Sequence, residues 1–200
     1  RGLRFDLLPS PGVRVDVDVF QQSVGRRVVP GHVVARFRGR SRSFTWDGVA
    51  NRGDQRVRDG YLFVRYRVRT GSPVRFDRID LRRVALRRDD RRFRIRPRFD
   101  RGERCAPIAA FKMLRPAFGG RGDSANYASY RLGSAGRVTL EILDDGEVVR
   151  RYRQGARAAG PLYRVRVAPR GLPRGNLVLR LRVDRGNGAV NVARLVSRRL

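Results

Sequence analysis

The chain is predicted to be all-β, and three features of its sequence lead to that prediction. Apolar and charged residues alternate with a period of two, most clearly over residues 13–20. Turn-forming pairs such as Asp47-Gly48 and Asp145-Gly146 interrupt the chain at short intervals. No stretch repeats apolar residues at helical spacing over three turns. Together these features indicate many short strands joined by tight turns, as in a sandwich or a barrel.

Each predicted strand has one apolar face and one charged face. Val13, Val15, Val17 and Val19 alternate with charged neighbours. The same alternation recurs further along the chain, at residues 62–68, 164–167 and 179–183. Further turns are predicted between these segments, at residues 59–60, 70–73 and 185–188. Strands of this kind belong to sheets with one buried and one solvated face.

The middle of the chain has a different composition. Residues 94–123 contain Pro97, Pro107 and Pro116 together with the single cysteine, Cys105. A short apolar run at residues 107–111 lies inside this segment and is predicted to pack as an irregular strand. We therefore expect two modules, residues 1–104 and 105–200, with the boundary in this segment.

The two halves of the chain form an internal repeat. Four pairs of segments occur in the same order: residues 15–20 with 138–143, 25–29 with 146–150, 43–46 with 162–165, and 59–68 with 174–183. Both halves then close on a basic, apolar strand, at residues 79–86 and 190–200. A series of matches in one order indicates a duplication of one structural unit.

The first half resembles the immunoglobulin-like domain of flagellar hook-capping proteins, the FlgD-like domain. The resemblance lies in the Trp46-Asp47-Gly48 turn, a glycine-bearing loop at residues 51–54, and the pair Gly60-Tyr61 before a long strand. It covers about residues 13–70. The resemblance implies two tandem immunoglobulin-like β-sandwich modules and a scaffold role in hook assembly. The same module also occurs in exported bacterial surface proteins.

The second half resembles a different part of the same family pattern. Residues 116–118, 128–132 and 138–151 are similar to its opening strands, with the hairpin turn at Gly146. The Trp-Asp-Gly turn is missing here, and residues 168–175, which end in Gly175, stand in its place. The fold survives such a change, whereas a function tied to the tryptophan turn would not.

The charge of the chain suggests a second kind of partner. The sequence contains 47 basic and 18 acidic residues, a net charge of +29, and Lys112 is the only lysine. Such an excess attracts nucleic acid, acidic cell-wall polymers or anionic headgroups. The candidate residues for this binding are arginines on predicted strand faces: Arg65, Arg67, Arg69, Arg91, Arg92, Arg94, Arg96 and Arg98. A half-solvated strand shows the same alternation without any ligand, and several arginines are expected to pair with Asp77, Asp80, Asp89, Asp90 and Asp100.

Catalytic, metal and cofactor sites are not predicted. His32 is the only histidine, and it stands in a Pro-Gly-His sequence typical of a loop or a strand edge. The acidic pairs at residues 89–90 and 144–145 have the positions of hairpin tips and not of metal ligands. Arg-Gly-Asp occurs at residues 52–54 and 121–123, where the abundance of Arg and Gly explains it by chance. Cys105 is expected to be a small buried hydrophobe, or a crosslink between chains if it is exposed.

These observations predict a non-catalytic module of a larger exported bacterial protein, secreted or at the cell surface. Its role would be structural, in assembly, or in adhesion, with other domains of the parent chain or surface protein as partners. The alternative is a module that binds anionic polymers, cell-wall polymer or nucleic acid, through its arginine faces. No apolar run reaches the length of about 18 residues that a membrane-spanning helix needs. The sequence begins at Arg1 without a methionine or a signal peptide, which we interpret as a processed product or an excised piece.

Overall fold

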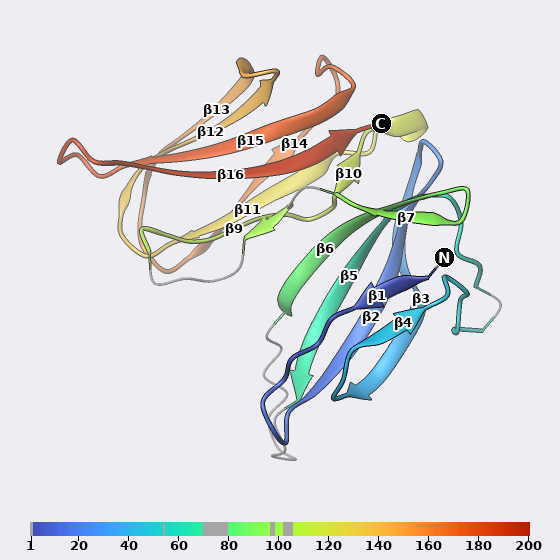
Figure 1. The fold of residues 1–200 in the computed structure, drawn as a ribbon. Helices are drawn as coiled ribbons and strands as arrows, with labels where there is room; N and C mark the ends of the chain where they lie inside the picture. The colour runs from blue at the N-terminus through green and yellow to red at the C-terminus, as the bar shows by residue number, and fades with distance from the viewer. Residues whose placement is uncertain (1, 54, 70–79, 97–98, 102–105) are drawn as a thin grey trace. The chain divides into compact units, whose positions relative to one another are not determined.

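A computed structural model describes residues 2–53, 55–69, 80–96, 99–101 and 106–200 (Figure 1). The described residues form an all-β chain with several sheets, as the alternation predicts. The chain divides into two compact units, Arg1–Arg96 and Pro97–Leu200, which we call the N-terminal unit and the C-terminal unit. The sequence places the corresponding boundary at residues 104–105, inside the proline-containing middle segment. The side chains of Arg69, Asp80 and Asp100 lie outside the described part of the structure. Asp77, Arg98 and Cys105 lie outside it as whole residues.

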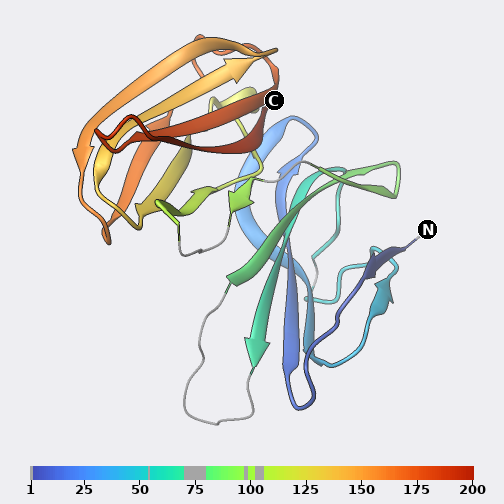
Figure 2. The same ribbon diagram turned by 60° about the vertical axis from the view of Figure 1, so that its left-hand side comes forward.

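The N-terminal unit is built on one large antiparallel sheet. In the described residues this sheet has the order β3-β2-β5-β6-β7, formed by β2 Arg14–Val24, β3 Arg27–Arg40, β5 Gly60–Arg69, β6 Asp80–Asp89 and β7 Arg92–Ile95. Two short strands, β1 Leu3–Phe5 and β4 Phe44–Trp46, pair antiparallel with each other. They lie over one face of the large sheet in both views (Figures 1 and 2). The unit therefore has one extensive sheet and a small cover.

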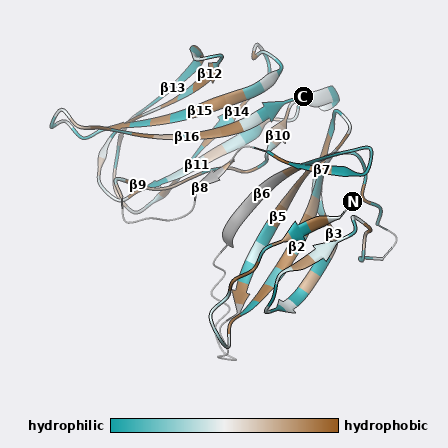
Figure 3. Ribbon diagram, viewed as in Figure 1, coloured by the Kyte–Doolittle hydropathy of each residue, from teal (hydrophilic) through white to brown (hydrophobic). Residues whose placement is uncertain are grey.

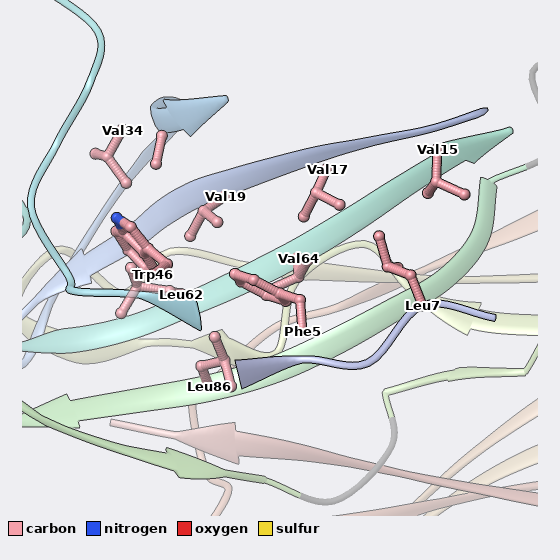
Figure 4. Close-up of a cluster of buried hydrophobic side chains, with 11 residues drawn as sticks. Phe5, Leu7, Val15, Val17, Val19, Val34, Trp46, Leu62, Val64 and Leu86 are labelled. Carbon is pink, nitrogen blue, oxygen red and sulfur yellow. The ribbon is translucent and has the colours of Figure 1, made fainter. Parts of the chain in front are cut away.

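The core of the N-terminal unit lies between the large sheet and this cover. Alternate residues of β2, namely Val15, Val17 and Val19, face inward with residues of β5 and β6 (Figure 4). Phe5 and Trp46 close the core from the side of the two short strands. The period-two pattern of the sequence thus predicts the buried face of β2 correctly.

The Trp46-Asp47-Gly48 turn is held by its own hydrogen bonds. The indole Nε1 of buried Trp46 donates to the carbonyl oxygen of Val49 at 2.7 Å. The Val49 amide donates to Oδ1 of Asp47 at 2.9 Å, which makes an Asx turn. Gly48 has a φ of 87°, in the region that favours glycine. The motif therefore fixes the tryptophan ring over the core.

The C-terminal unit contains two larger sheets. One has the order β10-β16-β15-β12-β13 within the described residues, from β10 Ala117–Phe118, β12 Gly136–Asp144, β13 Glu147–Arg157, β15 Gly175–Asp184 and β16 Val190–Arg199. The other has the order β14-β11-β9-β8, from β8 Asp100–Arg101, β9 Ile108–Met113, β11 Asn126–Leu132 and β14 Leu162–Val167. A 3-10 turn at Gly120–Gly122 follows β10. Among the described strands of this unit, only β10 runs parallel to its neighbour, β16.

The two sheets of the C-terminal unit share a sandwich-like core. Phe111, Met113 and Tyr130 are fully buried on the four-stranded sheet. Leu140 and Leu179 are fully buried on the five-stranded sheet. Bands of hydrophobic and hydrophilic residues alternate along β15 (Figure 3). The short apolar run at residues 107–111, predicted as an irregular strand, falls largely on β9.

The internal repeat of the sequence corresponds to a repeat in the sheets. The order β3-β2-β5-β6 in the first unit matches β13-β12-β15-β16 in the second, and all these pairings are antiparallel. The short pair β1-β4 matches β11-β14. Gly60 and Gly175, which the repeat aligns, each begin a strand with a φ of 142° and 143°. The described units differ at two places. β11 has β9 as a further neighbour, whereas β1 has no counterpart of β9 among the described residues. The strand next to β6 is the antiparallel β7, whereas the strand next to β16 is the parallel β10.

Candidate functional site: buried acids under arginine faces

The outer face of the N-terminal sheet, opposite the core, carries two acidic residues. The alternation that turns Val15, Val17 and Val19 inward turns Asp16 and Asp18 outward. Both carboxylates are nevertheless buried. Arginine side chains from the neighbouring strands β3 and β5 cover them. We call this set, Asp16, Asp18, Arg36, Arg38, Arg65 and Arg67, the N-terminal arginine face.

Asp18 is the centre of the N-terminal arginine face. It stands directly opposite Arg36 of β3 and Arg65 of β5 in the strand registers. Arg36 Nε lies 2.7 Å from Oδ1, while Nη2 of Arg65 and Nη2 of Arg67 lie 3.1 Å and 2.7 Å from Oδ2. One fully buried carboxylate thus joins three strands through charge-assisted hydrogen bonds.

The pKa of Asp18 follows from two opposing effects. Burial raises this pKa, but the hydrogen bonds from Arg36 and Arg65 and the charge of Arg67 lower it by more. The net pKa lies below the ordinary aspartate value. Asp18 is therefore ionised at neutral pH and serves as a counter-charge, not as a proton donor.

Asp16 is the second acid of the same face. Its Oδ2 accepts from Arg38 Nη1 at 2.6 Å, and its Oδ1 accepts from the Gly39 amide at 2.9 Å. Arg67 stands opposite it on β5. Asp16 thus joins the end of β3 to β2. Both acids of the N-terminal arginine face therefore have arginine partners.

An aromatic pair adjoins the acids on β2 and β5. The rings of Phe20 and Phe63 stack at a centroid distance of 4.6 Å and an interplanar angle of 7°. The guanidinium of Arg65 lies 4.8 Å from the centroid of the Phe20 ring. This cation–π contact orients Arg65 for its hydrogen bond to Asp18.

The C-terminal unit has the same arrangement around Glu141. This buried residue of β12 stands opposite Arg151 of β13 and Arg180 of β15. Arg151 Nε lies 3.0 Å from Oε1, and Arg180 Nε lies 2.7 Å from Oε2. Burial raises the pKa of Glu141, but the two arginine hydrogen bonds lower it by more, to below the ordinary glutamate value. We call a buried acid held by arginines of both neighbouring strands an arginine clamp.

The two arginine clamps occupy equivalent positions in the repeat. Asp18 aligns with Glu141 when residues 15–20 are matched to 138–143, and Arg65 aligns with Arg180 when 59–68 is matched to 174–183. The candidate residues named from the sequence do not include the acids. The signal that could have found them is an acidic residue on the charged face of a strand whose predicted neighbours carry arginines on their charged faces.

Six of the eight arginines predicted to bind polyanions have described side chains, and these six lie in two separate places. Arg65 and Arg67 belong to the clamp of Asp18. Arg91, Arg92 and Arg94 are exposed in the turn and on β7 of the β6–β7 hairpin, and Arg96 just beyond β7 is partly exposed. β6 lies between β7 and β5 in the sheet. Arg69 and Arg98 have no described side chains.

The expected pairing of arginines with nearby aspartates is observed only in part. Asp89 pairs with Arg87 at 3.0 Å on the exposed surface. The Asp90 amide donates to Asp59, and Asp59 in turn pairs with Arg88 at 3.2 Å. The expected partners Asp77, Asp80 and Asp100 lie outside the described side chains.

The remaining motif residues hold turns or begin strands. Gly60 begins β5, and the amide of buried Tyr61 donates to Ser23 Oγ at 2.9 Å. Gly146, with a φ of 94°, forms the turn between β12 and β13. His32 lies on β3, where its Nδ1 is 3.1 Å from the carbonyl oxygen of Pro30. These contacts are structural.

The described residues show no metal cluster and no membrane-spanning helix. They contain no group of three or more His, Cys, Asp or Glu residues placed to hold a metal ion. No helix among them has the length and apolar character needed to cross a membrane.

No protein-family model matches the chain, and no curated protein is similar to it in sequence at a significant level.

Proposed function

We propose that the chain is a tandem pair of FlgD-like, immunoglobulin-like β-sandwich modules with a non-catalytic role in a larger exported bacterial protein. The role is structural, in assembly, spacing or surface adhesion. The strand order of the C-terminal unit supports this proposal. One sheet with the order β14-β11-β9 and another with β16-β15-β12-β13 correspond to the division of strands in an immunoglobulin-type sandwich.

The observation that carries the structural role is the repeated arginine clamp. In each unit one carboxylate, that of Asp18 on β2 or Glu141 on β12, forms ion pairs with arginines of both neighbouring strands. Separating the strands would break these charge-assisted hydrogen bonds, which join a strand to both of its neighbours in each unit. The acids have lowered pKa values, the opposite of what a general acid needs at neutral pH.

Stretching single molecules of the whole chain tests the structural role. A tandem of load-bearing modules unfolds in two separate steps, each adding a contour length of roughly 300–350 Å at about 3.5 Å per residue. The Asp18→Asn variant should lower the force of one step only. A single step, or extension without a force peak, would contradict the proposal.

A second candidate function is the binding of anionic polymers, and the β6–β7 hairpin favours it. Arg91, Arg92 and Arg94 are exposed there, and the described residues give them no ion pair. The whole chain has a net charge of +29, so an exposed basic hairpin on it attracts phosphate or sulfate polymers.

Salt-dependent retention on heparin and DNA columns tests this second function. The triple variant Arg91→Ala, Arg92→Ala, Arg94→Ala should elute at much lower salt than the wild type. The matched control removes the same charge from the other unit, at exposed Arg164, Arg166 and Arg170. Equal elution of both variants would show attraction by net charge alone and would reject a site on the hairpin.

A further inference from the structure

The outer face of the five-stranded sheet in the C-terminal unit, which carries the Glu141 clamp, lacks one acid that the N-terminal arginine face has. In the repeat, Asp16 and Asp18 of β2 align with Thr139 and Glu141 of β12. Glu141 retains the clamp of Asp18, whereas Thr139 replaces the carboxylate of Asp16 by a hydroxyl. The position next to the clamp is therefore neutral in the C-terminal unit.

The arginines around this neutral position are still present. Thr139 stands directly opposite Arg153 of β13 and Arg182 of β15. Both arginines are exposed, and the described residues offer neither of them an ion pair or a side-chain hydrogen bond. Asp16, in contrast, holds Arg38 at 2.6 Å. Two uncompensated cations thus flank one hydroxyl on a solvated sheet face.

Arginines placed on either side of a central strand reach a common point above it. Neighbouring strands lie about 4.8 Å apart, so that two such side chains start about 10 Å apart and can converge. Arg151 and Arg180, two residues along the same strands, show that two such side chains can reach a common point. Both bind Glu141, at 3.0 Å and 2.7 Å. The row of Arg153, Thr139 and Arg182 has the same strands and the same registers.

We propose that Arg153, Thr139 and Arg182 form a binding site for a tetrahedral oxyanion, a phosphate or sulfate group that takes the place of the missing carboxylate. Each of the two guanidinium groups can donate two hydrogen bonds to such a group, and the threonine hydroxyl, which lies between them on β12, can donate one more. Arg137 and Arg194, exposed on the same sheet face, raise the local anion concentration.

This site is distinct from the functions proposed above. It lies in the C-terminal unit and shares no residue with the β6–β7 hairpin or with either arginine clamp. Failure of the site would leave the structural role and the hairpin experiment untouched, and failure of those would leave the site untouched.

Protection of arginines from phenylglyoxal, read residue by residue by mass spectrometry, tests the site in the full chain. Inorganic phosphate or sulfate, added at constant ionic strength, should slow the modification of Arg153 and Arg182 at least fivefold, with one common saturation midpoint. Arg164 and Arg166, exposed on β14 of the same unit, are internal controls and should react at an unchanged rate. Equal protection of all four arginines, or of none, would reject the site.

A second arm identifies the source of the anion. Polyphosphate and heparin present the same groups on a chain. A midpoint at least tenfold lower per group than for the free ion would support a site for a polymer-borne group. An equal midpoint would support a site for the free ion.

The Thr139→Asp variant tests the comparison on which the site rests. It restores the acid of the first unit, so it should abolish the protection of Arg153 and Arg182 by phosphate and raise the thermal midpoint of the C-terminal unit by roughly 3–5 °C. Asn187→Asp in the exposed β15–β16 turn makes the same charge change and should do neither. Undiminished protection in a folded Thr139→Asp variant would overturn the proposal.

Discussion

The N-terminal unit covers its large sheet with two strands of three residues, whereas the C-terminal unit covers its own with a second sheet of four described strands. The outer faces show the reverse order, because the unit with the smaller cover has more ion-paired residues on its outer face. Two buried acids and four arginines tie the N-terminal sheet, and one acid with two arginines ties the C-terminal sheet. We infer that the first unit depends more on its ionic face, because less apolar structure covers its core.

The two aligned glycines allow the largest test of this comparison. A Cβ on Gly60 would lie 2.3 Å from the carbonyl oxygen of Ser23, whereas a Cβ on Gly175 would meet nothing within 4 Å. Both have nearly the same positive φ. Gly60→Ala should therefore destabilise its unit by at least about 4 kcal/mol, from a clash in addition to backbone strain, and Gly175→Ala by about 1–3 kcal/mol from strain alone.

Urea unfolding separates the two glycine variants. Trp46, the only tryptophan, lies in the core of the N-terminal unit, so its fluorescence reports that unit, while far-UV circular dichroism reports both. Equal losses in the two variants would mean that the close approach of β5 to Ser23 is not required.

Removal of the charge of Asp18 should have the next largest effect. In Asp18→Asn, three arginines lose their common counter-charge at a fully buried position, and the expected loss is roughly 3 kcal/mol. The measurement is the urea midpoint by Trp46 fluorescence. The control is Asp6→Asn, whose ion pair with Arg4 is exposed and should contribute less than about 1 kcal/mol.

Removal of the charge of Glu141 should cost less. Only two arginines bind Glu141, and Arg151 is 48% exposed, so solvent replaces part of the lost interaction. We expect Glu141→Gln to cost about 1–2 kcal/mol, seen by circular dichroism while the Trp46 transition stays unchanged. Glu147→Gln, at an exposed position of β13, is the control. A larger loss than in Asp18→Asn would reverse the ranking of the two faces.

The pH dependence should show the smallest effect. Asp18 and Glu141 both have pKa values lowered in the folded state, so they stabilise it fully above their unfolded pKa values near 4. This contribution is lost as the pH falls through the lower, folded pKa values. Between pH 5 and pH 3 the wild type should lose about 1 kcal/mol more stability than the Asp18→Asn, Glu141→Gln double variant. Parallel curves for the two proteins would contradict the assignment.

The strands with regular alternation could be predicted from the sequence. Residues 62–68 and 179–183 lie on β5 and β15, and all but the first residue of the segment 13–20 lies on β2. The segments matched by the repeat lie on equivalent strands. Other strands lack this signal. β3 contains Pro30 and Gly31 and pairs with β2 through several register shifts, and β1 has only three residues. Their pairing depends on neighbours that a local pattern does not contain.

The sequence by itself placed Asp18 on the charged face of its strand, because side chains alternate along a strand. Only the tertiary structure decided which arginines meet which acid. Asp18 and Arg65 are 47 residues apart, and they become partners through the register of β2 with β5. For the same reason the sequence suggests Arg65 and Arg67 as candidates for polyanion binding, whereas the fold pairs them with a buried acid and leaves Arg153 and Arg182 beside a threonine.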